Sequence, residues 1–370
     1  MFTNAEVISQ HQIFKIMSEL LDKIKNNLET GEEQAPSDYL EKKEDFVIKD
    51  DIEYPEPEYL LSINDTATLP KGNLVALSAK WKNGKTFFCD IISGVFLGSR
   101  RFNNLRSLAE KGRVQIFDTE QAVSDTARMR KIIRTLTLNT RNDDFEVFCL
   151  RNAQIDKLTD NDDDVSRYEF IVDSINHFKP DLVVIDGIAD LIYNYNDVIE
   201  SQTMVNNLAT LASKNDCCIV VVMHQNKSKQ DKSMKGHIGT MLFQKCSDVF
   251  NIEKISNLFV VTHAVSRHRQ CGEFIFKIDD DGTPISAAAD HQALIEMKAK
   301  QENSKLESFL SKVFGDEKTL PRNTIVKRMK EDIGLSQSRA YRLINEALDK
   351  KLLVEDGKNF KFSQNEVFPI

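Results

Sequence analysis

The chain has 370 residues, of which 41% are hydrophobic and 29% are charged. This composition excludes a wholly disordered or fibrous protein, and the length favours two or three domains. The net charge of −8 excludes a uniformly basic nucleic-acid-binding protein but permits a local basic surface.

The location of the protein is predicted from its hydropathy and cysteine content. No apolar run approaches the ~18 residues of a membrane span, and residues 1–27 lack the basic and apolar regions of a signal peptide. The six cysteines form no C-x-x-C pair, which argues against a zinc ribbon or a redox dithiol. We therefore expect a cytoplasmic protein with reduced cysteines and no membrane contact.

Two segments precede the first predicted core strand. Residues 1–30 are predicted to form an amphipathic helical arm because apolar residues recur at helical spacing: Ile13, Ile16, Met17, Leu20, Leu21 and Ile24. Such an arm either docks on its own chain or contacts a neighbouring subunit. Residues 31–58 are rich in acidic side chains and contain three prolines, so we expect a linker there.

Residues 59–285 alternate between apolar strands and amphipathic helices. Strands are predicted at residues 74–78, 114–118, 147–150, 182–186 and 218–223. Helices are predicted at residues 86–96, 125–136, 168–178 and 203–213. This alternation predicts an α/β core with a mainly parallel sheet. Two further strands, at 258–263 and 273–278, are expected to extend one edge of the sheet in antiparallel fashion, because no crossover helix fits between them.

The pattern changes after residue 285. Residues 286–303 are predicted to be a linker helix, and residues 304–370 are predicted to be a winged helix-turn-helix domain. Helices of this domain are expected at 306–314, 322–330 and 336–347. Its two strands, at 352–354 and 360–362, flank Asp356-Gly357, which is a strong signal for a hairpin turn.

A phosphate-binding loop is predicted between the first core strand and the following helix. The segment matches the pattern G-x-x-x-x-G-K-[ST] except at its first position, and it comprises Ala79, Lys80, Trp81, Lys82, Asn83, Gly84, Lys85 and Thr86. Gly84 lets backbone N–H groups curl around phosphates, Lys85 neutralises the β and γ phosphates, and Thr86 offers a hydroxyl to Mg²⁺. The pattern therefore predicts that ATP and Mg²⁺ bind here.

Polar residues follow three other core strands, whose carboxyl ends meet at the same edge of the sheet. Asp186 ends one strand and is expected to hold Mg²⁺ through water. Gly187 follows it, so the carboxylate that orients the attacking water must lie elsewhere, and Glu120 beyond the strand at 114–118 is the predicted residue. His224 and Gln225 follow a third strand and are candidate contacts of the γ-phosphate.

These features resemble the RecA-like ATPase core, and within that group the hexameric replicative helicases and the plasmid RepA-type ring helicases. The resemblance covers roughly residues 59–279 and depends on the phosphate loop, on Glu120 and Asp186, and on the strand that ends at His224-Gln225. It implies a RecA-like fold, ATP hydrolysis and a homo-oligomeric ring, which we expect to be a hexamer.

The same helicases carry a basic-x-basic pair, closely followed by glycine, near the end of the core. Arg267, Arg269 and Gly272 fit this pattern. By resemblance, the two arginines are catalytic fingers that reach the nucleotide of the neighbouring subunit. Guanidinium charge at the transferred phosphoryl group is typically worth about 10³–10⁵ in rate. An exposed basic turn is the alternative interpretation.

Two segments are candidate DNA contacts. Residues 226–237 contain one aspartate and four lysines: Lys227, Lys229, Lys232 and Lys235. In RecA-like rings the corresponding loop lines the central channel, where lysines make salt-sensitive contacts with single-stranded DNA. Gln337, Arg339 and Arg342 lie near the start of the third helix of the predicted winged helix-turn-helix, where a recognition helix enters a DNA major groove. A solvated loop and a protein-docking domain are the respective alternatives.

The sequence as a whole predicts an ATP-dependent, ring-forming helicase of the RepA/DnaB type that acts in replication or mobilisation of a plasmid or mobile element. Two other functions remain open. One is an initiator or recombination mediator that binds DNA without unwinding it, and the other is a DNA-binding regulator that uses ATP only as an assembly switch.

Overall fold

The computed structural model describes residues 47–110, 112–137, 144–152, 166–226 and 233–362. The chain divides into two units, Met1–Glu56 and Pro57–Ile370. In the first unit, residues 47–56 are mostly exposed and form neither helix nor strand. The helical arm predicted at residues 1–30 lies outside the described residues, as do residues 31–46 of the predicted linker.

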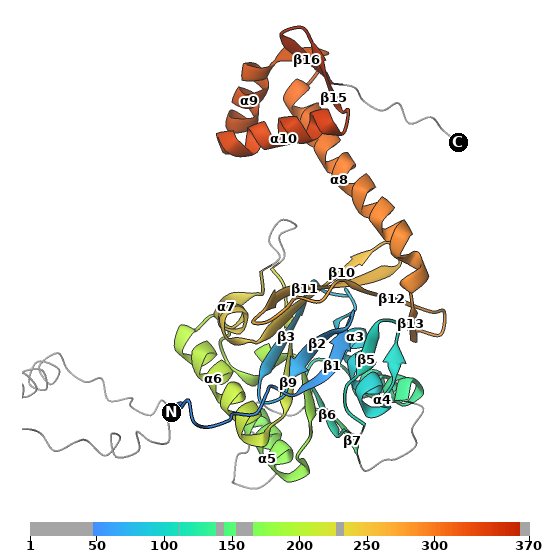
Figure 1. Cartoon of the computed structure of the whole chain (residues 1–370), viewed down its shortest axis with the longest axis vertical. Coiled ribbons are helices and arrows are strands. Elements are labelled where there is room, and N and C mark those ends of the chain that lie inside the picture. Colours follow the sequence, from blue (N-terminus) through green and yellow to red (C-terminus); the bar gives the residue numbers. More distant parts are fainter. Residues whose placement is uncertain (1–46, 111, 138–143, 153–165, 227–232, 363–370) are drawn as a thin grey trace, which may run out of the picture. The chain divides into compact units, whose positions relative to one another are not determined.

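The principal sheet of the second unit has nine strands in the order β13-β12-β11-β10-β3-β9-β8-β6-β7 (Figure 1). Their bounds are β3 Leu74–Ala79, β6 Val114–Asp118, β7 Phe145–Cys149, β8 Leu182–Asp186, β9 Cys218–His224, β10 Asp248–Ile255, β11 Leu258–Ser266, β12 Phe274–Ile278 and β13 Pro284–Ser286. The strands from β10 to β7 pair in parallel, and β10 to β13 pair in antiparallel fashion. The predicted parallel sheet with an antiparallel edge is therefore confirmed.

Helices cover both faces of this sheet (Figure 1). One face carries α3 Lys85–Leu97 and α4 Val123–Thr137, and the other carries α5 Arg167–Phe178, α6 Val198–Asn215 and α7 Gly236–Lys245. Alternate residues of a strand point to opposite faces. Val184 accordingly packs in the cluster beneath α3 and α4, while Val183 and Ile185 pack in the cluster beneath α5 and α6.

A second, four-stranded sheet has the order β2-β1-β5-β4. Its strands are β1 Tyr59–Ile63, β2 Thr66–Pro70, β4 Arg101–Phe102 and β5 Leu105–Ser107. Leu61, Ile63 and Leu105 of this sheet belong to the same buried cluster as Phe88 and Phe96 of α3. The small sheet therefore packs over the phosphate-loop helix.

The C-terminal part of the unit contains three helices and a three-stranded antiparallel sheet of order β14-β16-β15. The elements are α8 His291–Phe314, β14 Thr319–Pro321, α9 Arg322–Glu331, α10 Gln337–Asp349, β15 Leu353–Asp356 and β16 Asn359–Phe362. They share a hydrophobic cluster that includes Leu310, Phe314, Ile325 and Ile344.

The prediction of separate helices at 286–303 and 306–314 is wrong, because α8 is continuous. Residues 300–305 are polar but contain neither glycine nor proline, so nothing in them interrupts a helix. The turn of η3, Ala288–Asp290, precedes α8. Leu294 of α8 packs against Leu258, Val260 and Ile275 of the core strands.

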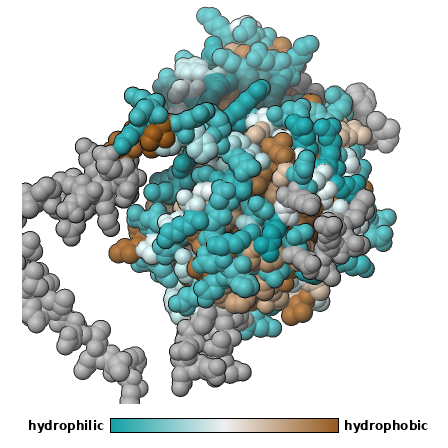
Figure 2. All heavy atoms as spheres, turned by 60° about the horizontal axis from the view of Figure 1, so that its bottom comes forward, coloured by the Kyte–Doolittle hydropathy of each residue, from teal (hydrophilic) through white to brown (hydrophobic). Residues whose placement is uncertain are grey.

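No helix within the described ranges is long and apolar enough to cross a membrane. All six cysteines are free thiols, and five of them are buried. Figure 2 shows a face on which hydrophilic residues predominate and apolar residues occupy separate small areas.

Candidate nucleotide-binding site

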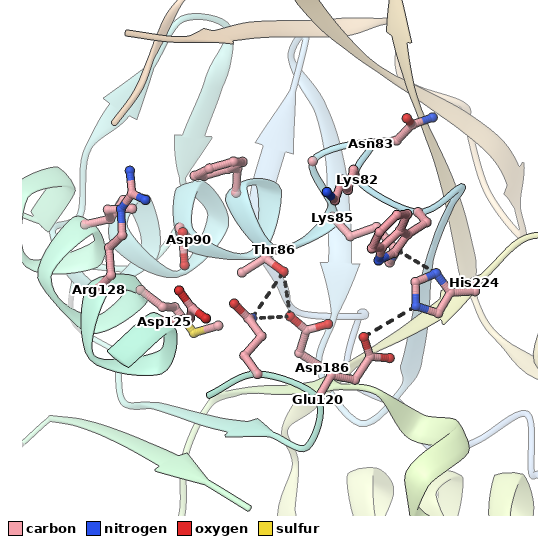
Figure 3. Close-up of a pocket in the computed structure, with 16 residues that line it drawn as sticks. Lys82, Asn83, Lys85, Thr86, Asp90, Glu120, Asp125, Arg128, Asp186 and His224 are labelled. Atoms are coloured by element: carbon pink, nitrogen blue, oxygen red, sulfur yellow. Dashed lines mark hydrogen bonds and ion pairs between the residues drawn. The ribbon is translucent and has the colours of Figure 1, made fainter. Parts of the chain in front are cut away.

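A cavity of about 360 Å³ opens where β3, β6, β8 and β9 end (Figure 3). The phosphate loop supplies one side of the cavity, and the start of α4 supplies another. The residues that line it are Trp81, Lys82, Asn83, Gly84, Lys85, Thr86, Phe87, Asp90, Glu120, Gln121, Asp125, Arg128, Met129, Ile132, Asp186 and His224. The structure therefore brings together most of the residues predicted to bind the nucleotide.

The loop accommodates alanine at its first position and requires glycine at its sixth. Ala79 is the last residue of β3, with its carbonyl bonded to the N–H of Gln225, and it does not have a positive φ. Gly84 has φ 81°, and a Cβ there would come within 2.5 Å of the Phe259 ring. Among the described residues no side chain caps the start of α3, which leaves its first N–H groups available to an anion.

Lys85, His224 and Glu120 form a chain of polar contacts. Lys85 Nζ lies 3.0 Å from His224 Nδ1, and His224 Nε2 lies 3.4 Å from Glu120 Oε2. An ammonium group can only donate a hydrogen bond, so His224 Nδ1 accepts from Lys85. The His224 Nε2–H then donates to the Glu120 carboxylate. The pKa of Glu120 is lowered chiefly by this hydrogen bond, which keeps its carboxylate ionised. Burial lowers the pKa of Lys85, against the attraction of Asp186 and Glu120.

Thr86 and Asp186 meet at the base of the cavity. The Thr86 hydroxyl donates to Asp186 Oδ2 at 2.8 Å, and Gln121 Nε2 lies 3.4 Å from the same oxygen. Asp186 is 2% exposed. Burial raises its pKa to about 6, and the nearby Glu120 and Asp118 charges act in the same direction. A nearby cation would stabilise the ionised form of this buried carboxylate.

These oxygen atoms fit Mg²⁺. Hydroxyl and carboxylate oxygens are ligands that Mg²⁺ prefers, usually together with water and substrate phosphates. In the part of the chain that the structure describes, no group of three or more His, Cys, Asp or Glu side chains could hold a metal ion. Thr86 directly and Asp186 through water would therefore hold a magnesium ion together with ligands from water and the nucleotide.

Asp118 fixes the turn that carries Glu120. Its Oδ1 accepts hydrogen bonds from the N–H groups of Glu120 (3.1 Å) and Gln121 (2.9 Å), and its Oδ2 accepts from the Thr126 hydroxyl at 2.6 Å. Asp118 also lies beside Asp186 in the parallel register of β6 and β8. Asp118 and Gln121 were not predicted as site residues, although Asp118 ends an apolar strand as Asp186 does.

Asp90 is another residue of the cavity that was not predicted. It lies one helical turn after Thr86, is 1% exposed, and neither of its carboxylate oxygens has a hydrogen-bond partner among the described residues. Burial raises its pKa well above the ordinary value, and the Asp186 and Asp118 charges add to this effect. The presence of an acidic residue within the apolar sequence Phe88-Cys89-Asp90-Ile91 could have identified it as a candidate site residue.

Among the predicted residues, Gln225, Arg267 and Arg269 do not line the cavity, and neither do Ala79 and Lys80 of the loop. The Gln225 side chain lies 3.4 Å from Asn251 Oδ1. The Arg267 guanidinium donates to the Lys245 carbonyl at 2.8 Å, at the carboxyl end of α7. Arg269 is exposed on the turn between β11 and β12. Neither arginine is among the described residues that line the cavity of its own subunit.

That turn is anchored by a buried histidine. His263 Nε2 lies 2.9 Å from Asp248 Oδ1, and His263 Nδ1 accepts a hydrogen bond from the Cys271 N–H at 3.2 Å. The Arg267 N–H donates to the Ser247 carbonyl at 3.0 Å. These hydrogen bonds hold both ends of the turn that carries Arg269 against the sheet.

The predicted DNA contacts lie in two places. Lys227, Lys229 and Lys232 fall outside the described residues, whereas Lys235 precedes α7 and lies 4.6 Å from the centroid of the Tyr195 ring. Gln337, Arg339 and Arg342 are exposed on the first part of α10.

One protein-family model matches this chain. The model of the AAA_25 family, described as an AAA domain, matches residues 39–230, slightly more than half of the chain. No curated protein matches. A solved structure described as an ATPase domain is 14% identical, covers 59% of this chain and 86% of that chain, and has a TM-score of 0.43. The crystal structure of the RadB recombinase is 17% identical, with coverages of 60% and 93% and a TM-score of 0.40.

Proposed function

Because the chain belongs to the AAA_25 family of AAA domains, we propose that it is an ATP-dependent DNA-handling motor of the ring-forming, RepA/DnaB-like helicase type. In this role it serves the replication or mobilisation of a plasmid or mobile element. The observation that carries the proposal is the meeting of Lys85, Thr86, Glu120 and Asp186 around one cavity at the ends of parallel strands.

Binding of ATP begins at the phosphate loop. The N–H groups at the start of α3 and the Lys85 ammonium receive the β and γ phosphates. Thr86, and Asp186 through water, would hold Mg²⁺. The bound ion supplies charge neutralisation at the phosphate oxygens. Gln121, at 3.4 Å from Asp186 Oδ2, orients the carboxylate.

Glu120 orients the water that attacks the γ-phosphate. Its carboxylate is ionised, and the Asp118 bonds to the following backbone fix its position. His224 contacts Glu120 and Lys85 at once. When Lys85 turns to a phosphate, His224 Nδ1 loses its partner while Nε2 keeps its contact with Glu120. Glu120, Lys85 and His224 thus respond together to the nucleotide.

Arg269 completes the site of the neighbouring subunit. Its exposure, and its absence from the residues that line its own cavity, support a role in trans. The same role in trans is less well supported for Arg267, because its guanidinium already donates a hydrogen bond to the Lys245 carbonyl at the end of α7. A homo-oligomeric ring, hexameric in our proposal, brings each Arg269 to the next nucleotide.

DNA contacts are assigned to two surfaces. The four lysines of residues 226–237 receive the phosphates of a single strand in the channel of the ring. The C-terminal helices and hairpin form a winged helix whose α10 presents Gln337, Arg339 and Arg342 to duplex DNA. The exposure of these three side chains supports this assignment.

ATP turnover and strand displacement test the proposal together. We expect single-stranded DNA to stimulate hydrolysis, and we expect the protein with ATP to displace a strand from a partial duplex. Stimulated turnover without displacement indicates the non-unwinding initiator or mediator. Turnover unaffected by DNA contradicts a DNA motor and favours the regulator that uses ATP as an assembly switch.

A further inference from the structure

The loop between η2, Ile188–Leu191, and α6 displays a tyrosine on a fixed backbone. The side chain of Tyr193 is 73% exposed. The Glu200 carboxylate accepts hydrogen bonds from the N–H groups of Tyr193 (2.7 Å) and Asn194 (3.0 Å), and Asp197 caps α6 by accepting from the Glu200 N–H at 2.8 Å. A loop ordered in advance loses little conformational entropy on binding, which makes the exposed ring an efficient contact surface.

Tyr195 joins this loop to the basic segment at residues 226–237. Its carbonyl accepts a hydrogen bond from the Ile238 N–H of α7 at 3.2 Å, and the Lys235 ammonium lies 4.6 Å from the centroid of its ring. A Cβ at Gly236 would come within 2.6 Å of the same ring, so this close approach requires glycine. The loop that carries Tyr193 therefore lies against the end of the basic segment.

A groove of about 860 Å³ extends from these residues to the nucleotide site. Tyr195, Asn226 and Lys235 line it, and it shares Glu120 and His224 with the nucleotide-binding cavity. The Lys235 N–H donates to the His224 carbonyl at 2.9 Å. A ligand held at Lys235 is therefore one backbone hydrogen bond away from the residue that contacts Glu120 and Lys85.

The charges at this surface favour an anionic ligand. Glu200 and Asp197 accept hydrogen bonds from backbone N–H groups, which offset their charge, and Asp190 accepts from the Thr119 hydroxyl at 2.9 Å. Lys80 and Lys235, which both line the groove, carry positive charge. The surface thus combines positive charge with a flat apolar ring, and a nucleotide unit offers the matching phosphate and base.

We propose that Tyr193 is a stacking platform for an unpaired base of single-stranded nucleic acid, whose phosphate Lys235 contacts. This inference rests on the proposed DNA-handling function and specifies the form of the strand. Bases within a duplex are already stacked on both faces, so an exposed ring selects an unpaired strand. The contact tolerates any base, because every base has a π face.

Oligonucleotides with and without bases test the inference. The affinity of the full chain for a thymidine oligomer and for an abasic oligomer of equal length is measured by fluorescence anisotropy at one salt concentration. We expect the wild type to bind the thymidine oligomer more tightly. Tyr193→Ala should weaken that binding roughly 5- to 140-fold per stacked base and leave the abasic oligomer unchanged. Tyr193→Phe, which keeps the ring, should restore the preference.

Two variants serve as controls. Phe243→Ala removes another aromatic ring, 52% exposed on α7, and should alter neither affinity. Lys235→Ala should weaken binding of both oligomers by similar factors, because it removes a phosphate contact. A wild type that binds neither oligomer overturns the proposed DNA function itself. Equal binding of both oligomers, unchanged in Tyr193→Ala, overturns the stacking platform alone. If Tyr193→Ala instead disrupts self-association in sedimentation while both affinities persist, the ring belongs to an interface between copies and the inference is wrong.

Discussion

Replacing Asp186 by asparagine is expected to stabilise the folded protein at neutral pH while it abolishes ATP hydrolysis. Asp186 is 2% exposed, and burial raises its pKa from 3.8 to about 6. The folded state therefore binds this proton more tightly than the unfolded state, and the stability contributed by protonation is lost as pH rises from 3.8 to 6. Asparagine has the same shape and keeps an oxygen that can accept from Thr86, but it does not titrate.

The expected difference follows from the pKa values. A pKa that moves from 3.8 to about 6 corresponds to about 3 kcal/mol at roughly 1.4 kcal/mol per pH unit. Without nucleotide and with EDTA, the stability gain of Asp186→Asn should be near zero at about pH 3 and approach about 3 kcal/mol at about pH 7. Urea denaturation, followed by circular dichroism at several pH values in this range, measures the difference in free energy of unfolding between the two proteins. Added Mg²⁺ and ATP should stabilise the wild type more than the variant. Parallel pH profiles of the two proteins would refute the reasoning.

Three further changes test the remaining assignments. Lys85→Ala should lower ATP affinity at least roughly 10-fold in equilibrium binding, because it removes the charge that faces the phosphates; unchanged affinity contradicts the assigned role. Arg269→Ala and Glu120→Gln should each bind ATP but lose at least roughly 100-fold in turnover, and mixing the two should restore part of the activity. No recovery in demonstrated mixed assemblies would mean that Arg269 acts within its own subunit. Alanine at all four lysines of residues 226–237 should weaken single-strand binding and flatten its salt dependence while basal turnover survives; an unchanged salt slope assigns the strand to another surface.

Local patterns predicted the buried parallel strands well. Strands β6 and β8 have the predicted bounds, because a strand covered on both faces is an uninterrupted apolar run. Strand β10 was missed because its sequence, Asp-Val-Phe-Asn-Ile-Glu-Lys-Ile, mixes polar and apolar residues. It is a strand because β3 pairs with one of its edges and β11 with the other. Strand β3 lies far away in the sequence, and β11 follows β10 directly. Helix α8 was divided in the prediction because a polar run resembles a linker.

The phosphate loop, the two carboxylates at strand ends and the alternation that produces an α/β sheet could all be predicted from local sequence patterns. These features depend on residue type and near spacing, which steric and hydrogen-bonding rules fix locally. The meeting of particular side chains depends instead on how distant segments fold together. Examples are the pairing of Asp118 with Asp186, the approach of Gln121 to Thr86, and the Phe259 ring that excludes any side chain at Gly84. The tertiary structure also directs Gln225 towards Asn251 and away from the cavity. Strand order and side-chain direction arise from packing between distant segments, and no local pattern encodes that packing.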